Sequence, residues 1–382
     1  MSEIKTDEEE KPPSSDEDSD PATNSPMKKE SSQSKISKTL KNNQYNNLNN
    51  KNNNSGIVEV YKDNLNSEMK NLISLLNDYN YIGMDTEFPG IVYSISSISD
   101  DFYYKSLKLN VESLKLIQLG ITLSNSNGEN PKPYHTWQFN FEFDYLKDKY
   151  SESSLKLLIS SGINFNKLKT NGINHKKFFE MIKNSGLVLN PKNFWISFHG
   201  SYDFAYMLNN LLGNSLPNNE REFTHILEGF FPNHYDIKIL IKEKGNLQGS
   251  LNKLATHLDV MREGKIHQAG SDSLVTINVF WKLIKSGLID SKELIEKKNI
   301  LFGILRGKDN EETINYTKIN FGTNNNNFVH KFNENNIIYL PYAYNMSMNM
   351  NYFYPQFMMN GLNNGVYNIQ MINNKNNLLQ YC

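Results

Sequence analysis

The sequence predicts an α/β protein in which helices flank a mixed β-sheet, with a polar tail at either end. Strand-like segments come early and close together in the chain, and helical segments then alternate with a further strand. Consecutive strands pair readily as hairpins, whereas a strand reached through a helix pairs in parallel. One domain over residues 57–306 accounts for this periodicity, although a length of 382 residues would allow more domains.

Hydrophobic periodicity locates the expected elements within that domain. Apolar residues at helical spacing over 69–76 lead into an apolar strand at 81–88. Further strands are expected at 116–123, 134–143 and 194–198, and helices at 153–160, 173–184, 204–212, 221–230, 251–258 and 272–284.

The two ends have a different composition. Residues 1–56 are acidic and rich in Ser and Asn, and residues 307–382 are Asn-rich with scattered aromatic residues and no regular period. Neither segment has a pattern that could bury enough apolar surface to offset backbone ordering. We expect both to be disordered, low-complexity tails.

Composition excludes several classes of protein. The single cysteine, Cys382, allows no internal disulfide, and we find neither a secretory leader nor an apolar run near 18 residues. These features favour a protein of the cytoplasm, with the nucleus as a second expected compartment, and no membrane partner. The net charge of −1 lacks the basic surplus of proteins that grip long nucleic acids, so any such substrate should be held locally or delivered by a partner.

Three short segments carry an unusual set of acidic residues and a histidine. They are 84–90 (Met-Asp-Thr-Glu-Phe-Pro-Gly), 198–204 (Phe-His-Gly-Ser-Tyr-Asp-Phe) and 267–273 (His-Gln-Ala-Gly-Ser-Asp-Ser). Asp85 and Glu87 are two residues apart on an expected strand, so both side chains leave the same face of the sheet. Two carboxylates held together raise each other's pKa unless a cation lies between them. The pair therefore suits a divalent metal, although an Asp-x-Glu pair taken alone is a weak signal.

Asp203 and Asp272 each lie at the start of an expected helix. The helix dipole stabilises a negative charge there by about 0.3–1 kcal/mol, so either residue taken alone is more simply explained as a helix-start residue. The four acids together, beside apolar segments, instead predict two divalent cations about 4 Å apart, the arrangement that hydrolyses phosphodiesters. Mg²⁺ is the expected metal, with Mn²⁺ or another divalent cation as the alternative.

His267 lies five residues before Asp272, in the loop that precedes its helix. A neutral imidazole there could accept a proton from the attacking water, which makes His267 the candidate general base. For an isolated histidine, donation to a backbone carbonyl would be the simpler explanation. His199, four residues before Asp203, could pack in the core, orient that carboxylate or contact the site directly.

The order Asp-x-Glu, Asp and His-x₄-Asp resembles the DEDDh branch of the 3′–5′ exonucleases, which adopt the ribonuclease-H-like fold. Further segments resemble the Caf/Pop deadenylases, the catalytic subunits of the CCR–NOT complex. These segments are 84–90, 117–120 (Ile-Gln-Leu-Gly), 137–141 (Trp-Gln-Phe-Asn-Phe), 161–163 (Ser-Gly-Ile) and 267–273. The resemblance spans about residues 65–290.

The resemblance implies a poly(A)-specific 3′–5′ exoribonuclease that shortens mRNA tails and releases 5′-AMP by two-metal hydrolysis. Asp85, Glu87, Asp203 and Asp272 match the metal-binding acids of the family and His267 matches its general base, with all five intact. Single-stranded poly(A) RNA is then the expected substrate. The expected partners are the CCR–NOT scaffold and a companion deadenylase subunit.

Two features depart from the family. The segment after Gly90 is usually basic, whereas residues 91–104 here contain no Lys or Arg, so the sequence gives no support for a phosphate contact from this loop. The Asn-rich tails have no counterpart in compact family members. Adenosine preference follows from the resemblance alone, because Phe88 and Pro89 are explained equally well as a wedge against a base and as core residues.

Two other functions fit the same residues. One is a DNA-directed exonuclease with the same chemistry, which activity on matched RNA and DNA oligomers would separate. The other is an interaction module that chiefly scaffolds a complex. The intact set of five residues argues against a scaffold alone, and the absence of a basic surplus indicates that partners matter.

Overall fold

The structure, a computed structural model, describes residues 56–95, 102–213 and 215–304, together with five short strands farther along the chain. These strands are β7 (Ile319–Asn320), β8 (Val329–His330), β9 (Ile337–Ile338), β10 (Met359–Leu362) and β11 (Val366–Gln370). The rest of the two expected tails lies outside the described residues, so their disorder stays a prediction. Within the described ranges, no helix combines the length and the apolar character needed to cross a lipid bilayer.

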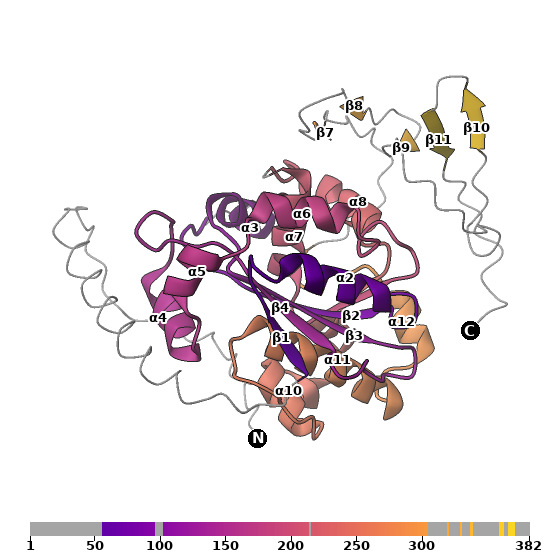
Figure 1. Cartoon of the computed structure of the whole chain (residues 1–382). Coiled ribbons are helices and arrows are strands. Elements are labelled where there is room, and N and C mark those ends of the chain that lie inside the picture. The colour runs from indigo at the N-terminus through magenta and orange to yellow at the C-terminus, as the bar shows by residue number, and fades with distance from the viewer. Residues whose placement is uncertain are drawn as a thin grey trace, which may run out of the picture.

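A mixed sheet forms the centre of the molecule (Figure 1). It has six strands, in the order β1-β4-β3-β2-β5-β6. The strands are β1 (Ile57–Val60), β2 (Tyr81–Glu87), β3 (Gln118–Ser124), β4 (Thr136–Asn140), β5 (Phe194–Ser197) and β6 (His234–Asp236). The consecutive strands β2, β3 and β4 pair antiparallel. The remaining strands pair in parallel with their neighbours. These pairs are β1 with β4, β5 with β2, and β6 with β5. The expected mixed sheet is thus confirmed.

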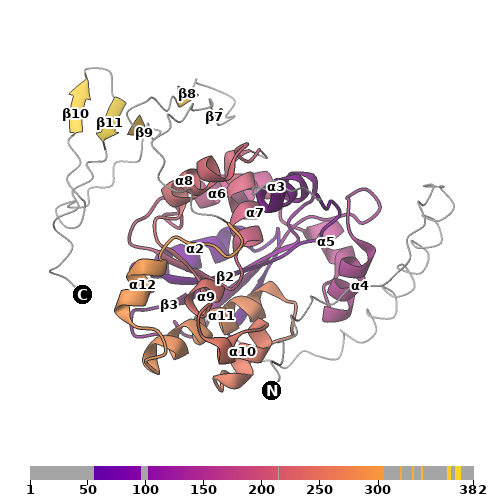
Figure 2. The same cartoon turned by 180° about the vertical axis from the view of Figure 1, so that it is seen from behind.

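Helices cover both faces of the sheet (Figures 1 and 2). One face packs against α2 (Leu65–Leu75), α3 (Phe102–Ser113), α6 (His175–Lys183), α7 (Ser201–Leu212) and α8 (Glu220–Phe230). The other face packs against α9 (Ile237–Leu240), α10 (Leu251–His257) and α11 (Ala269–Lys285), with α12 (Ser291–Lys297) beyond them. The helices α4 (Glu152–Ser161) and α5 (Phe165–Asn171) form a smaller cluster of their own around Phe143.

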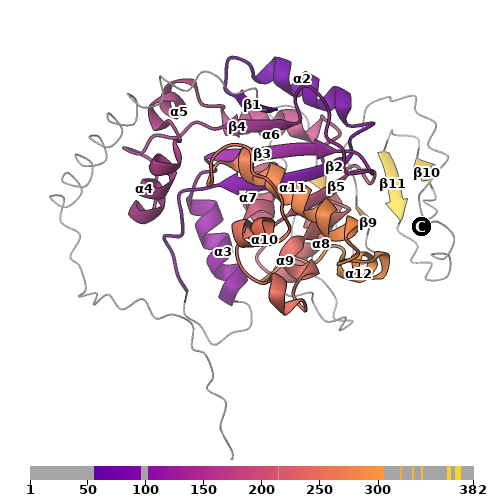
Figure 3. The same cartoon turned by 90° about the horizontal axis from the view of Figure 1, so that it is seen from below.

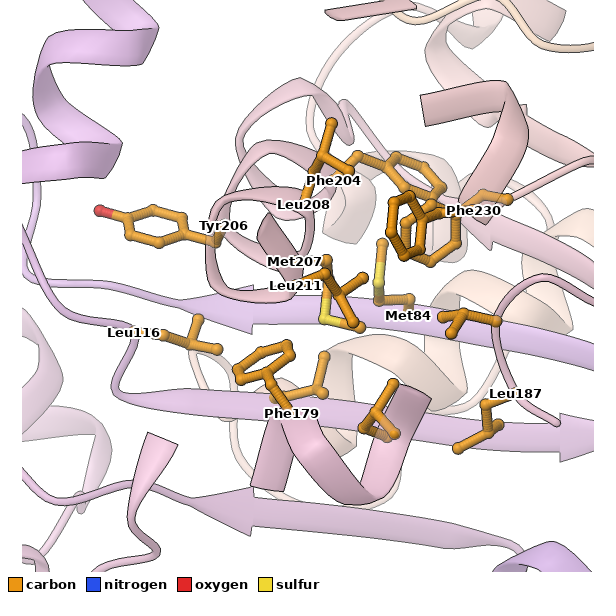
Figure 4. Packing of buried hydrophobic residues seen from close by; sticks show 14 of the residues in the cluster. Met84, Leu116, Phe179, Leu187, Phe204, Tyr206, Met207, Leu208, Leu211 and Phe230 are labelled. Carbon is orange, nitrogen blue, oxygen red and sulfur yellow. The ribbon is translucent and has the colours of Figure 1, made fainter. Parts of the chain in front are cut away.

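The larger core lies between the sheet and α7. Figure 4 shows Met207 and Leu211 of α7 pointing toward Met84 of β2 and Phe179 of α6. All four side chains are almost fully buried. At about 25 cal/mol per Å² of apolar surface, side chains of this size each contribute roughly 1.5–3 kcal/mol when buried. The helix that carries Asp203 is therefore fixed firmly on the sheet.

The opposite face is shaped for close contact with α11, which lies across β2 and β3 (Figure 3). Gly83 and Gly120 face this helix. A Cβ atom at Gly120 would lie 1.9 Å from the carbonyl oxygen of Ala269, and one at Gly83 would lie 2.6 Å from that of Ser273. Only glycine at these two positions lets the first turns of α11 lie against the strands.

Most of the expected elements are confirmed to within a few residues, including the helix and strand around 69–88 and the strands and helices that lead to α11. Within residues 57–306, the sequence analysis did not identify the strands β1 and β6 or the α-helices α3, α5, α9 and α12. Five of these six elements have seven residues or fewer, which is too short for a clear hydrophobic period. The exception is α3, whose buried residues Tyr104, Leu107 and Val111 do have helical spacing.

We expect Gly120→Ala to destabilise the protein by about 3 kcal/mol or more, because a backbone contact of this kind cannot relax by a simple rotamer change. That loss should lower the midpoint of thermal unfolding by at least about 5 °C. Gly229→Ala is the matched control, because this glycine lies in α8 with open space around it. The control should be neutral or slightly stabilising. Equal midpoints for the two variants would contradict the close packing of α11.

Candidate active site

Asp85 and Glu87 lie on β2, a strand in the interior of the sheet. Their side chains leave the face covered by α11, as the two-residue spacing predicts. Across the strand pair, Asp85 lies opposite Gly120 and Glu87 opposite Gln118. The glycine leaves room for the start of α11, which carries Asp272 in its first turn. The sheet and this helix thereby bring three carboxylates to one edge of the molecule.

Asp203 reaches the same edge from the other face. The strand β5 runs parallel to β2, so both strands end at this edge, and α7 begins four residues after β5. The hydroxyl of Thr86, the residue between the two acids of β2, donates to Oδ1 of Asp203 at 2.5 Å. Asp203 is 7% exposed and Asp272 is 6% exposed. All four predicted acids therefore converge.

Burial makes Asp85, Glu87 and Asp203 reluctant to ionise. It raises the pKa of Asp85 well above its ordinary value, and the charges of Asp203, Asp272 and Glu87 raise it further. Burial also raises the pKa of Glu87 to about 8, and that of Asp203 to about 7 against the opposing effect of the Thr86 hydrogen bonds. A group of carboxylates with these pKa values binds cations to relieve its own repulsion.

His267 lies beside this cluster, in the loop before α11 and exposed to solvent. One ring nitrogen of His267 and one carboxylate oxygen each from Glu87 and Asp272 lie within 4.8 Å of one another. The backbone N–H of His267 donates to Oδ2 of Asp272 at 2.9 Å, and the residue has a left-handed φ of 59°. The predicted histidine thus borders the site, at a spacing at which its ring nitrogen and the two carboxylate oxygens could surround one cation.

The donor set fits a hard divalent cation. Carboxylate oxygens are the ligands that Mg²⁺ and Mn²⁺ prefer, and an open site with few protein ligands leaves positions for water and phosphate. Within the described residues, Arg262 is the one cation whose charge offsets this cluster, through an ion pair of 2.6 Å with Asp272. A single guanidinium leaves most of the negative charge uncompensated.

His199 and Phe88, which the sequence analysis also considered for the site, pack against neighbouring aromatic rings. The ring of His199 meets Phe302 edge-on with centroids 4.9 Å apart. Phe88 stacks on Tyr202 at 5.2 Å and tilts against Tyr206 at 5.0 Å, so α7 occupies one of its faces. Phe88 is half-buried, whereas His199 is exposed and makes its ring contact with Phe302 at the surface.

The sequence analysis missed Asp236, at the end of β6. Its fully buried carboxylate accepts four backbone N–H groups, from His199, Gly200, Lys238 and Phe302, at 2.8–3.1 Å. Burial raises its pKa, while the four hydrogen bonds act in the opposite direction. Because two of the donors lie just before α7, Asp236 fixes the start of the helix that carries Asp203. An acid directly before the apolar segment 237–241 (Ile-Lys-Ile-Leu-Ile) was the available signal.

Three glutamines hold the start of α11 and were also missed. Gln118 accepts the N–H of Ala269 at 3.3 Å, and Gln138 accepts that of Gly270 at 2.8 Å. Both glutamines donate through Nε2 to Oε1 of Gln268. Side chains of β3 and β4 thus cap a helix whose N-cap residue, Gln268, makes no side-chain cap of its own. The network fixes the backbone between His267 and Asp272.

A lysine from another part of the chain, Lys149, lies beside the loop that follows Gly90. Val92 and Tyr93 donate their N–H groups to Oδ1 of Asn110, which holds the described part of the loop on α3. Lys149 donates to the hydroxyl of Tyr93 at 3.0 Å. A positive charge therefore lies beside the loop even though the loop sequence supplies none.

Comparisons with known proteins find related ribonucleases. The family model for the CAF1 family ribonuclease matches residues 60–183 and 179–280. The chain is 44% identical over 257 residues to "Probable CCR4-associated factor 1 homolog 7" of Arabidopsis thaliana, covering 65% of this chain and 93% of the relative. It is 42% identical over 256 residues to "Poly(A) ribonuclease pop2" of Schizosaccharomyces pombe, covering 65% and 75%.

Solved structures give the same result. The Mg²⁺- and Mn²⁺-bound form of S. pombe Pop2p matches with a TM-score of 0.62 and 42% identity, over 65% of this chain and all of that one. A chain in the structure of the yeast NOT1 MIF4G domain co-crystallised with CAF1 matches with a TM-score of 0.56 and 32% identity, over 64% and 96%. The fold is therefore the ribonuclease-H-like nuclease fold, and the chain belongs to the CAF1 ribonuclease family.

Proposed function

We propose that this protein is a metal-dependent 3′–5′ exoribonuclease that shortens poly(A) tails of mRNA and releases 5′-AMP. The observation that carries the proposal is the convergence of four acids and one histidine from three distant segments at one edge of the sheet. Buried carboxylates with raised pKa values in mutual contact are costly to a fold, and a catalytic role explains why they are kept. Relatives named as poly(A) ribonucleases support the choice of substrate.

Asp85, Glu87, Asp203 and Asp272 would hold two divalent metal ions, Mg²⁺ or Mn²⁺. When bound, such ions supply an activated water and stabilise the charge that develops on the phosphate. The four carboxylates have the number and chemistry that two ions require, since each ion is bound through few protein ligands and keeps positions for substrate. By setting where the ions lie, the carboxylates would also determine how the reacting phosphate is oriented for in-line attack.

His267 would act as the general base. Its ring is exposed and lies beside Glu87 and Asp272, where it can reach a water that enters from solvent. The glutamine network and the His267 N–H bond to Asp272 fix the backbone around it, so the imidazole is held in place without being buried. An exposed imidazole can return the proton to solvent after each cleavage.

We also propose that the protein works as a CCR4–NOT subunit, bound to the scaffold and to a companion deadenylase, in the cytoplasm and also in the nucleus. The net charge of −1 provides little general attraction for long RNA, which favours delivery of the substrate by partners. One relative is named "CCR4-NOT transcription complex subunit 7" in Caenorhabditis elegans, with 39% identity over 236 residues. The NOT1–CAF1 structure provides the precedent for the scaffold contact.

The direct test is digestion of 5′-labelled RNA that ends in a 3′ oligo(A) tail, with Mg²⁺ and with excess EDTA. We expect stepwise shortening from the 3′ end with release of 5′-AMP, and no reaction in EDTA. Matched oligomers with a 3′ oligo(C) tail, or made of DNA, should be shortened more slowly. Faster digestion of the DNA oligomer would favour the alternative of a DNA-directed exonuclease, and no digestion of any oligomer would favour a scaffold.

Changing Asp85, Glu87, Asp203 or Asp272 singly to alanine should reduce hydrolysis to below about a tenth of the wild-type rate, because a two-metal site functions as a unit. The rates are compared at saturating Mg²⁺. Thermal melts with EDTA should show that each variant remains folded. A folded variant with more activity than this would remove its residue from the proposed site.

His267→Ala should slow the chemical step by about 10²–10⁴-fold, the usual contribution of a general base. Single-turnover rates should recover in part at high pH, where hydroxide replaces the base. The affinity for Mn²⁺, measured by calorimetry, should stay close to that of the wild type. If it falls as far as in Asp272→Ala, His267 is a metal ligand instead.

The metal-free protein should lose stability as the pH rises from about 5 to about 8. Over this range the folded protein retains protons on Glu87, with its pKa near 8, and on Asp203, with its pKa near 7, whereas the unfolded chain has released them. Each such group lowers the free energy of unfolding by up to about 1.4 kcal/mol per pH unit. Thermal melts in EDTA measure the slope, and Glu87→Gln should flatten it. An unchanged slope in that variant would show that Glu87 ionises normally.

A further inference from the structure

Arg262 is the one residue of the exposed loop 261–267 whose side chain turns inward. Its guanidinium Nη1 lies 2.6 Å from Oδ1 of Asp272 and donates to the hydroxyl of Ser271 at 2.8 Å. Nη2 donates to Oδ1 of Asn252 on α10 at 2.5 Å. Only 17% of the side chain is exposed. The guanidinium is thus fixed between α10 and α11 by three partners and is not free to follow a substrate.

This arrangement orients the carboxylate of Asp272 completely. Oδ1 is bound by Arg262, and Oδ2 accepts the N–H of His267 at 2.9 Å. Both partners come from the loop that immediately precedes α11. Asp272 therefore has one defined orientation, with a carboxylate oxygen held close to Glu87 and to the ring of His267. A carboxylate oriented in advance loses less freedom when it binds a cation.

Arg262 also sets the charge of the site. Four ionised carboxylates and one guanidinium give a net charge of −3, and two divalent cations would bring the total to +1. A net positive site attracts a phosphodiester, which carries one negative charge. Without Arg262 the loaded site would be neutral and would lose that attraction.

We propose that Arg262 is a positioning residue that orients Asp272 for metal binding. The inference rests on the proposed function, because it takes Asp272 to be a metal ligand. Loss of Arg262 has two opposed effects on metal binding. Losing the positive charge of the guanidinium would by itself tighten the binding of a metal cation. Losing the support of the ligand Asp272 weakens it by about 10–100-fold, and this effect is the larger.

The test is the dissociation constant for Mn²⁺, measured by calorimetry on the full-length protein without RNA. We expect Arg262→Met to weaken binding by about 10–100-fold. The concentration of Mn²⁺ that gives half-maximal activity should rise by a similar factor, while the rate at saturating Mn²⁺ falls much less. Lys265→Met is the matched control, because it removes the same charge from the same loop at an exposed position. Its affinity for Mn²⁺ should match the wild type.

Two further variants separate charge from orientation. Arg262→Lys keeps the charge but lacks the forked guanidinium that reaches Asp272, Ser271 and Asn252 together. Asn252→Leu keeps Arg262 but removes its anchor on α10. Both should weaken Mn²⁺ binding by a smaller factor than Arg262→Met. Thermal melts in EDTA identify any variant that fails to fold, and the two milder variants then decide the question. Wild-type or tighter binding in Arg262→Met, or in both milder variants, overturns the inference.

Asp85→Ala serves as the reference for the proposed function itself. If the wild type binds Mn²⁺ and Asp85→Ala does not, the metal site stands whatever the Arg262 variants show. If Asp85→Ala binds Mn²⁺ as well as the wild type, the proposed metal site is wrong. The orientation of Asp272 by Arg262 would then have no role in metal binding.

Discussion

Mutual repulsion among four carboxylates at the end of β2 is the constraint on which the rest of the structure depends. Two of these acids are more than nine-tenths buried, and burial raises the pKa values of Asp85, Glu87 and Asp203. A fold that keeps such groups together without a cation must hold them by other means. Here the means are two well-packed helices, α7 and α11, one on each face of the sheet.

Each acid outside the strand has its own support. Asp203 is held by the Thr86 hydroxyl, and the start of its helix is held by the buried carboxylate of Asp236. Asp272 is held by Arg262 and by the His267 N–H, and its helix is capped by glutamines from β3 and β4. These supports are polar groups with satisfied hydrogen bonds, so the site is rigid before any ligand arrives. Rigidity of this kind is what proton transfer and in-line attack require.

The orientation of the two helices explains why the site lies at this edge. β2 and β5 are parallel and end together, so α7 starts beside the acids of β2. The glycines of β2 and β3 let α11 descend onto the other face, where its first turn reaches Asp85 and Glu87. The reacting groups therefore come from rigid elements and their immediate termini, and the exposed loop before α11 contributes His267.

The sequence by itself determined the fold class, most of the long elements and the five candidate catalytic residues. Those features depend on short-range signals: hydrophobic period, the Asp-x-Glu spacing on a strand, and acids at helix starts. A hydrophobic period cannot be established in three to seven residues. It therefore could not predict the short elements β1, β6, α5, α9 and α12. The missed helix α3 is different, since Tyr104, Leu107 and Val111 already had helical spacing.

Only the tertiary structure decided how the site is supported. The contacts of Thr86 with Asp203 and of Gln138 with Gly270 join residues 117 and 132 positions apart, and no local pattern records such pairs. The same holds for Asp236, whose four N–H donors come from three segments of the chain. Sequence fixes which groups can carry charge or donate hydrogen bonds. Their partners are chosen by the packing of helices on the sheet, because polar groups carried into the interior must find hydrogen bonds among the neighbours that packing brings to them.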